Sequence, residues 1–197
     1  MADTKISALS SNSTLDFTEV VPIVQGSTTK KMALSELSGR LFAKSAGLWY
    51  PLAKSAVAVN CPADTSEDIL ATVTIPAGAM GANGQLRVWS QWSYTNSANN
   101  KFLKIRLGGI GGTAHFAVAV TTSAEFSDFR HIANRNSQSS QIGGPGGSSP
   151  FGSTSNPVST SAIDTSASTT LVFTGQKVSS GETITLEAYG VDLLYGA

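Results

Sequence analysis

From residue 48 onward, apolar and polar residues alternate in short segments that are interrupted by Gly, Asn, Pro and Ser. In residues 85–94, for example, Leu86 and Trp92 fall on one face of an extended strand, whereas Trp89 falls on the other. Alternation with a period of two is typical of half-buried β-strands, in which successive side chains point to opposite faces. The pattern therefore predicts an all-β structure for this part of the chain.

No long amphipathic helix separates the expected strands. Parallel neighbours need a long crossover that is usually helical, so an antiparallel sandwich is favoured, and among sandwiches a jelly roll accommodates about eight strands in two sheets. We expect one jelly-roll domain at residues 48–197. The expected strands are residues 49–53, 56–61, 67–75, 85–94, 102–107, 113–120, 125–135, 169–177 and 182–194.

Alternation also assigns residues to the two faces of these strands. Leu103 is expected in the core and Phe102 opposite it, and Phe116 is expected in the core with His115 opposite it. In the last strand the expected inward residues are Ile184, Leu186 and Ala188. The run Gly108-Gly109-Ile110-Gly111-Gly112 precedes a strand and not a helix, so it is interpreted as a hairpin turn and not as a phosphate-binding loop.

Residues 1–44 have a different character and are predicted to form an extended N-terminal arm. Residues 19–26 suggest a short edge strand with a Pro, and the spacing of three leucines in residues 32–44 predicts a short helix. The few apolar groups of this segment cannot offset the entropy of ordering about forty residues. The arm is therefore expected to become ordered by docking onto a partner. The candidate docking residues are Val21, Ile23, Val24, Leu34, Leu37 and Leu41.

Composition limits the classes of function. Lys+Arg and Asp+Glu are both 13, so the net charge is zero, which disfavours binding to nucleic acid. Charged residues make up 13%, whereas 28 Ser and 20 Thr supply most of the polar surface, which suits packing against copies of the same chain. No signal peptide or membrane-spanning run is recognisable, so synthesis in a cytoplasm without membrane insertion is expected.

The histidines and the cysteine of the sequence do not form a catalytic or metal-binding pattern. His115 and His131 stand on different expected strands without metal-ligand spacing, and Cys61 is the single cysteine, expected to be a small buried residue. No nucleophile elbow is present. We therefore expect neither an enzyme nor a bound cofactor or metal ion.

Two features indicate contact with another molecule. Trp89 is predicted to point away from the core, so Trp89, together with Phe102, is a candidate subunit interface, although a loop of the same chain could also cover Trp89. Residues 142–156 are rich in Gly, Ser and Pro and are expected to form a loop without regular pairing. This loop is interpreted either as a surface insertion or as a contact loop carrying Pro150 and Phe151.

The segments KISAL (residues 5–9), DFTEVVPIVQG (16–26), TTKK (28–31) and LSEL (34–37) resemble the N-terminal attachment segments of fibre and spike proteins of tailed bacteriophages. The segments ILATVTIPAGAMGANG (69–84), NSANNK (96–101) and GETITLE (181–187) resemble a prophage-encoded jelly-roll domain similar to the trimeric tumour-necrosis-factor-like jelly rolls. The resemblance implies a homotrimer.

From this resemblance we expect a virion protein, made in the bacterial host, whose residues 1–44 attach to another virion protein such as the portal, tail adaptor or capsid. The first hypothesis is a tail fibre or adsorption module for host attachment. The second is a capsid decoration or cement protein. The third is a lectin-like module that binds host-surface glycan.

Overall fold

The computed structural model describes residues 20–25, 28–33, 48–145 and 158–196, and the chain divides into two compact units, Met1–Phe42 and Ala43–Ala197. In the first unit, β1 (Val20–Gln25) pairs antiparallel with β2 (Thr28–Ala33), from Val20 opposite Ala33 to Gln25 opposite Thr28. The expected edge strand is thus confirmed, whereas β2 was not predicted. The expected short helix lies outside the described residues.

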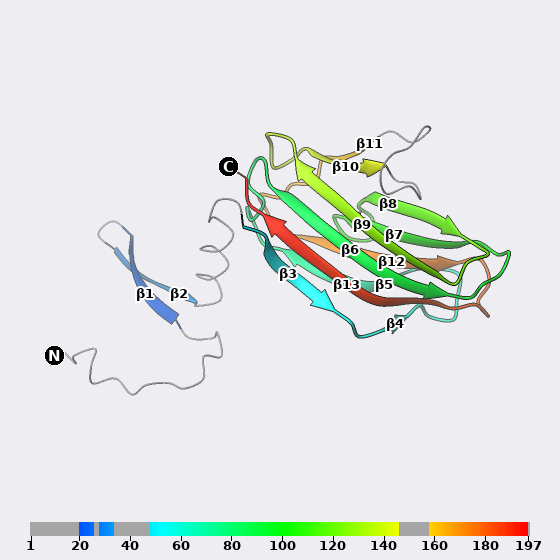
Figure 1. The fold of residues 1–197 in the computed structure, drawn as a ribbon. Coiled ribbons are helices and arrows are strands. Elements are labelled where there is room, and N and C mark those ends of the chain that lie inside the picture. The colour runs from blue at the N-terminus through cyan, green and yellow to red at the C-terminus, as the bar shows by residue number, and fades with distance from the viewer. Residues whose placement is uncertain (1–19, 26–27, 34–47, 146–157, 197) are drawn as a thin grey trace, which may run out of the picture. The chain divides into compact units, whose positions relative to one another are not determined.

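The second unit is an all-β sandwich of two antiparallel sheets, which confirms the all-β, antiparallel part of the predicted fold (Figure 1). The large, seven-stranded sheet has the order β11-β10-β9-β6-β13-β3, with β4 also paired to β13, and the small, four-stranded sheet has the order β5-β12-β7-β8. The strands are β3 (Tyr50–Ser55), β4 (Val59–Asn60), β5 (Glu67–Ile75), β6 (Gln85–Tyr94), β7 (Lys101–Leu107), β8 (Thr113–Val120), β9 (Glu125–Asn134), β10 (Gln141–Pro145), β11 (Val158–Ser161), β12 (Thr169–Lys177) and β13 (Ile184–Leu194).

The strand pairs are nested along the sequence. The outermost pair is β3 with β13, followed inward by β5 with β12, β6 with β9, and β7 with β8. These four pairs lie alternately in the large and the small sheet, so the chain is wound as one long antiparallel ribbon folded over itself. The innermost connection is the turn at Gly108–Gly112, where Gly108 and Gly109 adopt positive φ values of 92° and 77°, and the predicted hairpin turn is confirmed.

The core lies between the two sheets. The main strands supply inward residues at every second position. In β7, for example, Lys101, Leu103, Ile105 and Leu107 are buried, and the residues between them are partly exposed. The large sheet supplies Trp92, whose indole nitrogen donates to Ser90 Oγ (2.9 Å), and the small sheet supplies Phe173, which lies 4.9 Å from the ring of Tyr189. The largest fully buried apolar side chains are Trp92, Phe116, Phe173, Ile75, Met80, Leu86, Leu103, Ile105, Leu107 and Ile132.

Two β-bulges change the expected faces. The pairing of β13 with β6 shifts between Leu186 and Ala188, so Ala188 lies opposite Gln91 on the outer face, and the prediction that Ala188 is in the core was wrong. The pairing of β7 with β8 shifts between Ile105 and Arg106, and His115, expected opposite the core residues, is 1% exposed. An extra residue in one strand reverses the faces beyond it, and the alternation within that strand does not reveal the insertion.

The expectation that residues 142–156 lack regular pairing was wrong at the start of this range. Residues 142–145 belong to β10, which pairs with β9 and, through a register shift at Gly143/Pro145, with β11. The glycines allow this pairing because His115 lies where a side chain at Gly143 would project, with Nδ1 2.5 Å from the position of an added Cβ. The β10–β11 hairpin extends the large sheet beyond β9.

The position of Phe173 between the sheets gives a test of the core. We expect Phe173→Ala to lower the free energy of unfolding by about 3–5 kcal/mol, because it removes a fully buried ring and leaves a cavity. Val178→Ala, at an exposed position, should change the free energy of unfolding by less than about 0.5 kcal/mol. Urea denaturation of both variants measures the difference, and equal effects would contradict the placement of Phe173.

Candidate functional site

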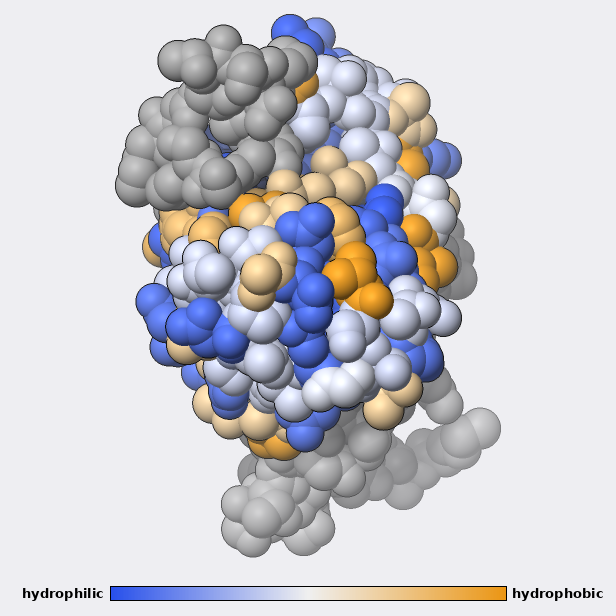
Figure 2. Space-filling view, turned by 90° about the vertical axis from the view of Figure 1, so that its right-hand side faces the viewer, coloured by the Kyte–Doolittle hydropathy of each residue, from blue (hydrophilic) through white to orange (hydrophobic). Residues whose placement is uncertain are grey.

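Exposed hydrophobic side chains are distributed over much of the sandwich. On the end that faces the viewer in Figure 2, hydrophobic residues form small groups separated by hydrophilic ones. Among the exposed large hydrophobic residues that the structure describes, Trp89 (37% exposed) and Phe129 (43%) are the two that face each other across neighbouring strands. This pair lies on the outer face of the large sheet.

Further rings and one ion pair surround Trp89 and Phe129. The ring of His131 lies 5.1 Å from that of Phe129 and 6.1 Å from that of Trp49, both edge to face. Arg87 lies over the ring of Trp49, with its guanidinium carbon 4.5 Å from the ring centroid. We call this surface the aromatic face, and it consists of Trp49, Arg87, Trp89, Phe129, His131 and Asp192.

A glycine in the neighbouring strand allows Trp89 to lie against the sheet. Gly190 of β13 is the register partner of Trp89, and an added Cβ at Gly190 would lie 2.0 Å from Trp89 Nε1 and 2.6 Å from Cε2. The indole therefore covers the backbone of β13, and Gly190 is buried beneath it. A side chain at residue 190 would displace the indole from the sheet.

The charges of the aromatic face are paired. Arg87 donates to Asp192 Oδ2 from Nε (3.0 Å) and from Nη2 (2.8 Å), so this part of the face carries no net charge. His131 is the register partner of Arg87 on β9. Partial burial, together with the charge of Arg87, lowers the pKa of His131, which is therefore neutral at physiological pH.

Phe102, the other predicted interface residue, lies on a different surface. It is paired with Ala119 and Gln176 on the outer face of the small sheet, where Lys104 Nζ lies 5.8 Å from its ring centroid. Trp89 and Phe102 thus lie on opposite outer faces of the sandwich, and the structure does not bring them together.

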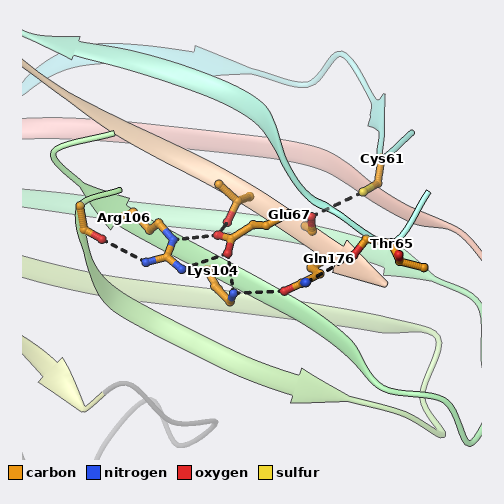
Figure 3. Close-up of polar contacts among 9 residues, drawn as sticks. Cys61, Thr65, Glu67, Lys104, Arg106 and Gln176 are labelled. Carbon is orange, nitrogen blue, oxygen red and sulfur yellow. Dashed lines mark hydrogen bonds and ion pairs between the residues drawn. The ribbon is translucent and has the colours of Figure 1, made fainter. Parts of the chain in front are cut away.

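The outer face of the small sheet is dominated by a charged cluster around Glu67 (Figure 3). Glu67 accepts hydrogen bonds from Lys104 Nζ (2.6 Å), Arg106 Nε (2.7 Å) and Nη2 (3.0 Å), and Thr174 Oγ1 (2.6 Å). Burial alone would raise the pKa of Glu67, but the hydrogen bonds from Arg106, Lys104 and Thr174 outweigh it and lower the pKa to about 2. The carboxylate therefore stays ionised and joins β5, β12 and β7, which is a structural role.

Cys61 is buried and poorly nucleophilic. Its thiol donates to Asp68 Oδ2 (3.4 Å), and burial, reinforced by this hydrogen bond, raises the pKa of Cys61 to about 11. Because the thiolate is the reactive form, the thiol is inert at neutral pH. The predicted role as a small buried residue is confirmed.

A polar seam joins the β10–β11 hairpin to the small sheet. His115 Nδ1 lies 2.9 Å from Ser159 Oγ, and Nε2 lies 3.0 Å from Ser161 Oγ. Ser161 in turn donates to Gln141 Oε1 (2.9 Å), and Gln141 is fully buried and donates to Asn134 Oδ1 (3.0 Å). Burial lowers the pKa of His115 to about 4, so the ring is neutral and holds the hairpin by hydrogen bonds alone.

The inward side of β9 carries a buried ion pair. Arg130 Nε donates to Asp128 Oδ2 (2.8 Å), and the guanidinium carbon lies 4.8 Å from the centroid of the Phe116 ring. Burial raises the pKa of Asp128, while the hydrogen bond from Arg130 opposes this effect. Both residues are buried, at 6% and 3% exposed.

The remaining predicted site residues are only partly described. Val21, Ile23 and Val24 lie on β1, whereas Leu34, Leu37, Leu41, Pro150 and Phe151 lie outside the described residues. Within the described ranges, no group of three or more His, Cys, Asp or Glu side chains is placed to hold a metal ion. In the same part of the chain, no helix has the length and apolar character needed to cross a membrane.

Sequence reasoning identified Trp89 but missed the rest of the aromatic face. Phe129 and His131 alternate with Asp128 and Arg130, so the sequence groups them on one face of β9. Which face points outward depends on the register of β9 against β6, and no signal in the sequence reveals that register. Trp49 was expected at the start of the strand 49–53, but it precedes β3, and its contact with His131 follows only from the tertiary structure.

Comparisons with known proteins found no matching family model and no matching curated protein. Among solved structures, the VP2 subviral particle of infectious bursal disease virus has 10% identity and a TM-score of 0.33, over 94% of this chain and 41% of that chain. Structures of the Gt and Gx strains of the same virus have 12% and 11% identity and TM-scores of 0.31 and 0.29, over 96% and 88% of this chain and 42% and 44% of those chains. This chain thus spans about two fifths of their length, and likenesses this weak carry no conclusion about its function.

The neutral state of His115 gives a pH prediction. The unfolded chain takes up a proton at His115 near pH 6.5 and the folded chain near pH 4, so the stability that this residue contributes is complete above pH 6.5 and is lost as the pH falls towards 4. We expect the free energy of unfolding to fall by up to about 3 kcal/mol over this window. Urea denaturation at pH 7, 5.5 and 4.5 measures this decrease in the free energy of unfolding.

His115→Gln should remove most of this pH dependence because glutamine does not titrate. His131→Gln is the matched control and should retain most of it, since His131 is exposed. The same pH dependence in His115→Gln and wild type would contradict the assignment to His115.

Proposed function

We propose that this chain is a structural component of a tailed-phage virion, a homotrimeric fibre or adsorption module that its N-terminal arm anchors to the particle. The aromatic face is the observation that carries the proposal. A sheet with Trp89 and Phe129 exposed side by side is incomplete as an isolated surface, because such aromatic groups are typical of the centre of protein interfaces.

The dimensions of the large sheet fit a second copy of the chain. β6, β9 and β13 contain 10, 10 and 11 residues. With about 3.3 Å per residue and about 4.8 Å between strands, these three strands present about 490 Å², and the six residues of the neighbouring β3 add about 95 Å². A stable interface buries about 800 Å² on each partner, so these four strands supply about three quarters of that area.

Charge is also compatible with self-association. The chain has no net charge, and the Arg87–Asp192 pair on the aromatic face is internally neutral. Two copies of this chain therefore meet without overall like-charge repulsion. Because Trp89 and Phe129 are 37% and 43% exposed, complete coverage buries about 60–110 Å² of each side chain. At about 25 cal/mol per Å², this contributes about 1.5–2.5 kcal/mol for each residue before the costs of association.

Two further features support the jelly-roll fold and the attachment role of the N-terminal arm in this proposal. The nested pairing of β3 with β13, β5 with β12, β6 with β9 and β7 with β8 is the winding of a jelly roll, as the family resemblance implies. The hairpin β1–β2 belongs to a separate compact unit, and a lone two-stranded hairpin is marginally stable in water. Docking onto another virion protein would supply the missing contacts.

Solution mass tests the assembly. At pH 7.5 we expect size-exclusion chromatography with light scattering to give a mass of three chains for the full-length protein. The double substitution Trp89→Ser and Phe129→Ser should give a single chain with an unchanged circular dichroism spectrum, because it removes the centre of the contact. Ile69→Ser, at an exposed position on β5, is the matched control and should remain trimeric. A wild-type mass of one chain would contradict the proposal.

Particle composition tests the location. Quantitative mass spectrometry of purified virions should find the chain in tens of copies, in a multiple of three per attachment site. Deletion of residues 1–42 should leave the second compact unit folded but absent from particles, because the arm makes the attachment. Hundreds of copies per particle would instead favour a capsid decoration protein, and absence of the full-length chain from particles would refute a virion role.

A further inference from the structure

His131 lies at the centre of the aromatic face. Its ring is in edge contact with Phe129 on one side and with Trp49 on the other, at 5.1 and 6.1 Å between centroids. Its register partner on β6 is Arg87, next but one to Trp89. A molecule that covers Trp89 and Phe129 therefore also covers the histidine.

Among the described residues, no free carboxylate faces His131. On β6 the charged neighbour is Arg87, and on β13 it is Asp192, whose carboxylate already accepts two hydrogen bonds from Arg87. The strand on the other side, β10, contains no charged residue. On β9 itself, Asp128 is buried and paired with Arg130, and Glu125 is six residues away, which corresponds to about 20 Å along an extended strand.

The more distant charges do not change this balance. Lys54 lies on β3, three strands away from β9, where it is paired with Gly190, and it adds a positive charge. Glu187 of β13 is engaged by the hydroxyl of Ser93 near the opposite end of β6. A protonated His131 would thus sit beside the cation of Arg87 with no carboxylate of its own.

We infer that acid releases the subunit contact at the aromatic face, and that His131 is the residue whose protonation releases it. The inference rests on the proposed self-association and adds its regulation. When a second copy covers the face, water leaves the surface of His131, and a charged imidazolium loses its hydration without gaining a partner. The assembled state therefore favours the neutral form of His131, whereas the free subunit exposes the His131 ring to solvent, where the ring accepts a proton.

The direction of the effect follows from this difference in proton binding. Release of each subunit is coupled to uptake of one proton at His131, so a trimer takes up three protons when it dissociates. The association constant of the trimer then falls by up to about a thousandfold for each pH unit below the pKa of the free subunit. Partial burial and Arg87 place that pKa below the ordinary value of 6.5, so dissociation is expected as the pH falls below 6.5.

The experiment is light scattering of the full-length protein at a fixed micromolar concentration from pH 7.5 to pH 5, with circular dichroism at each pH. We expect wild type to change from three chains to one chain with its β-sheet spectrum intact, and to reassemble when the pH is returned to 7.5. His131→Phe keeps a ring between Phe129 and Trp49 but cannot titrate, and it should remain assembled to pH 5. His131→Gln provides a second non-titrating variant.

The histidine of the buried seam supplies the matched control. His115→Gln removes the other histidine of the chain, away from the aromatic face, and should dissociate over the same pH range as wild type. A wild-type trimer that persists at pH 5, or a His131→Phe protein that dissociates as wild type does, would overturn acid release and leave the assembly standing. A single-chain mass already at pH 7.5 would overturn both the assembly and its regulation.

Discussion

The sandwich depends on the burial of apolar side chains between two antiparallel sheets that are wound from one nested ribbon. Every second residue of the main strands is committed to this core, with Trp92 and Ile132 from the large sheet facing Phe173 and Ile105 from the small sheet. Because each inward side chain fixes the orientation of its neighbours in the strand, the outer faces follow from the inner ones. The functional surface is thus a consequence of core packing.

The outer faces of the two sheets differ in the side chains that they expose to solvent. On the small sheet, Glu67 forms direct hydrogen bonds with both Lys104 and Arg106, so the charged groups of this face are held by one another, with one positive charge in excess. On the large sheet, aromatic rings surround one neutral ion pair, and their apolar area remains in contact with water. This asymmetry is the reason to place the proposed subunit contact on the large sheet, and it separates Trp89 from Phe102, which sequence reasoning had grouped together.

The two histidines have different roles because their surroundings differ. His115 is enclosed by Ser159, Ser161 and the small sheet, so its neutral ring serves as a fixed connector of the β10–β11 hairpin. His131 is exposed among aromatic rings and beside Arg87, so its protonation is free to respond to whatever covers the face. Alternation had suggested that His115 would point away from the core, but the bulge in the pairing of β7 with β8 buries it.

The sequence by itself determined the all-β class of the sandwich and the position of strands such as β5 and β6. It also determined the hairpin turn at Gly108–Gly112 and the outward direction of Trp89. These features follow from period-two alternation and from turn residues, which are local signals. The pairing of Trp89 with Phe129, the strand β10 in a glycine-rich segment and the outward position of Ala188 were decided only by the tertiary structure. These features depend on register, on bulges and on contacts between residues far apart in the sequence. No local pattern encodes them, since a shift of one residue leaves the alternation intact and reverses every face.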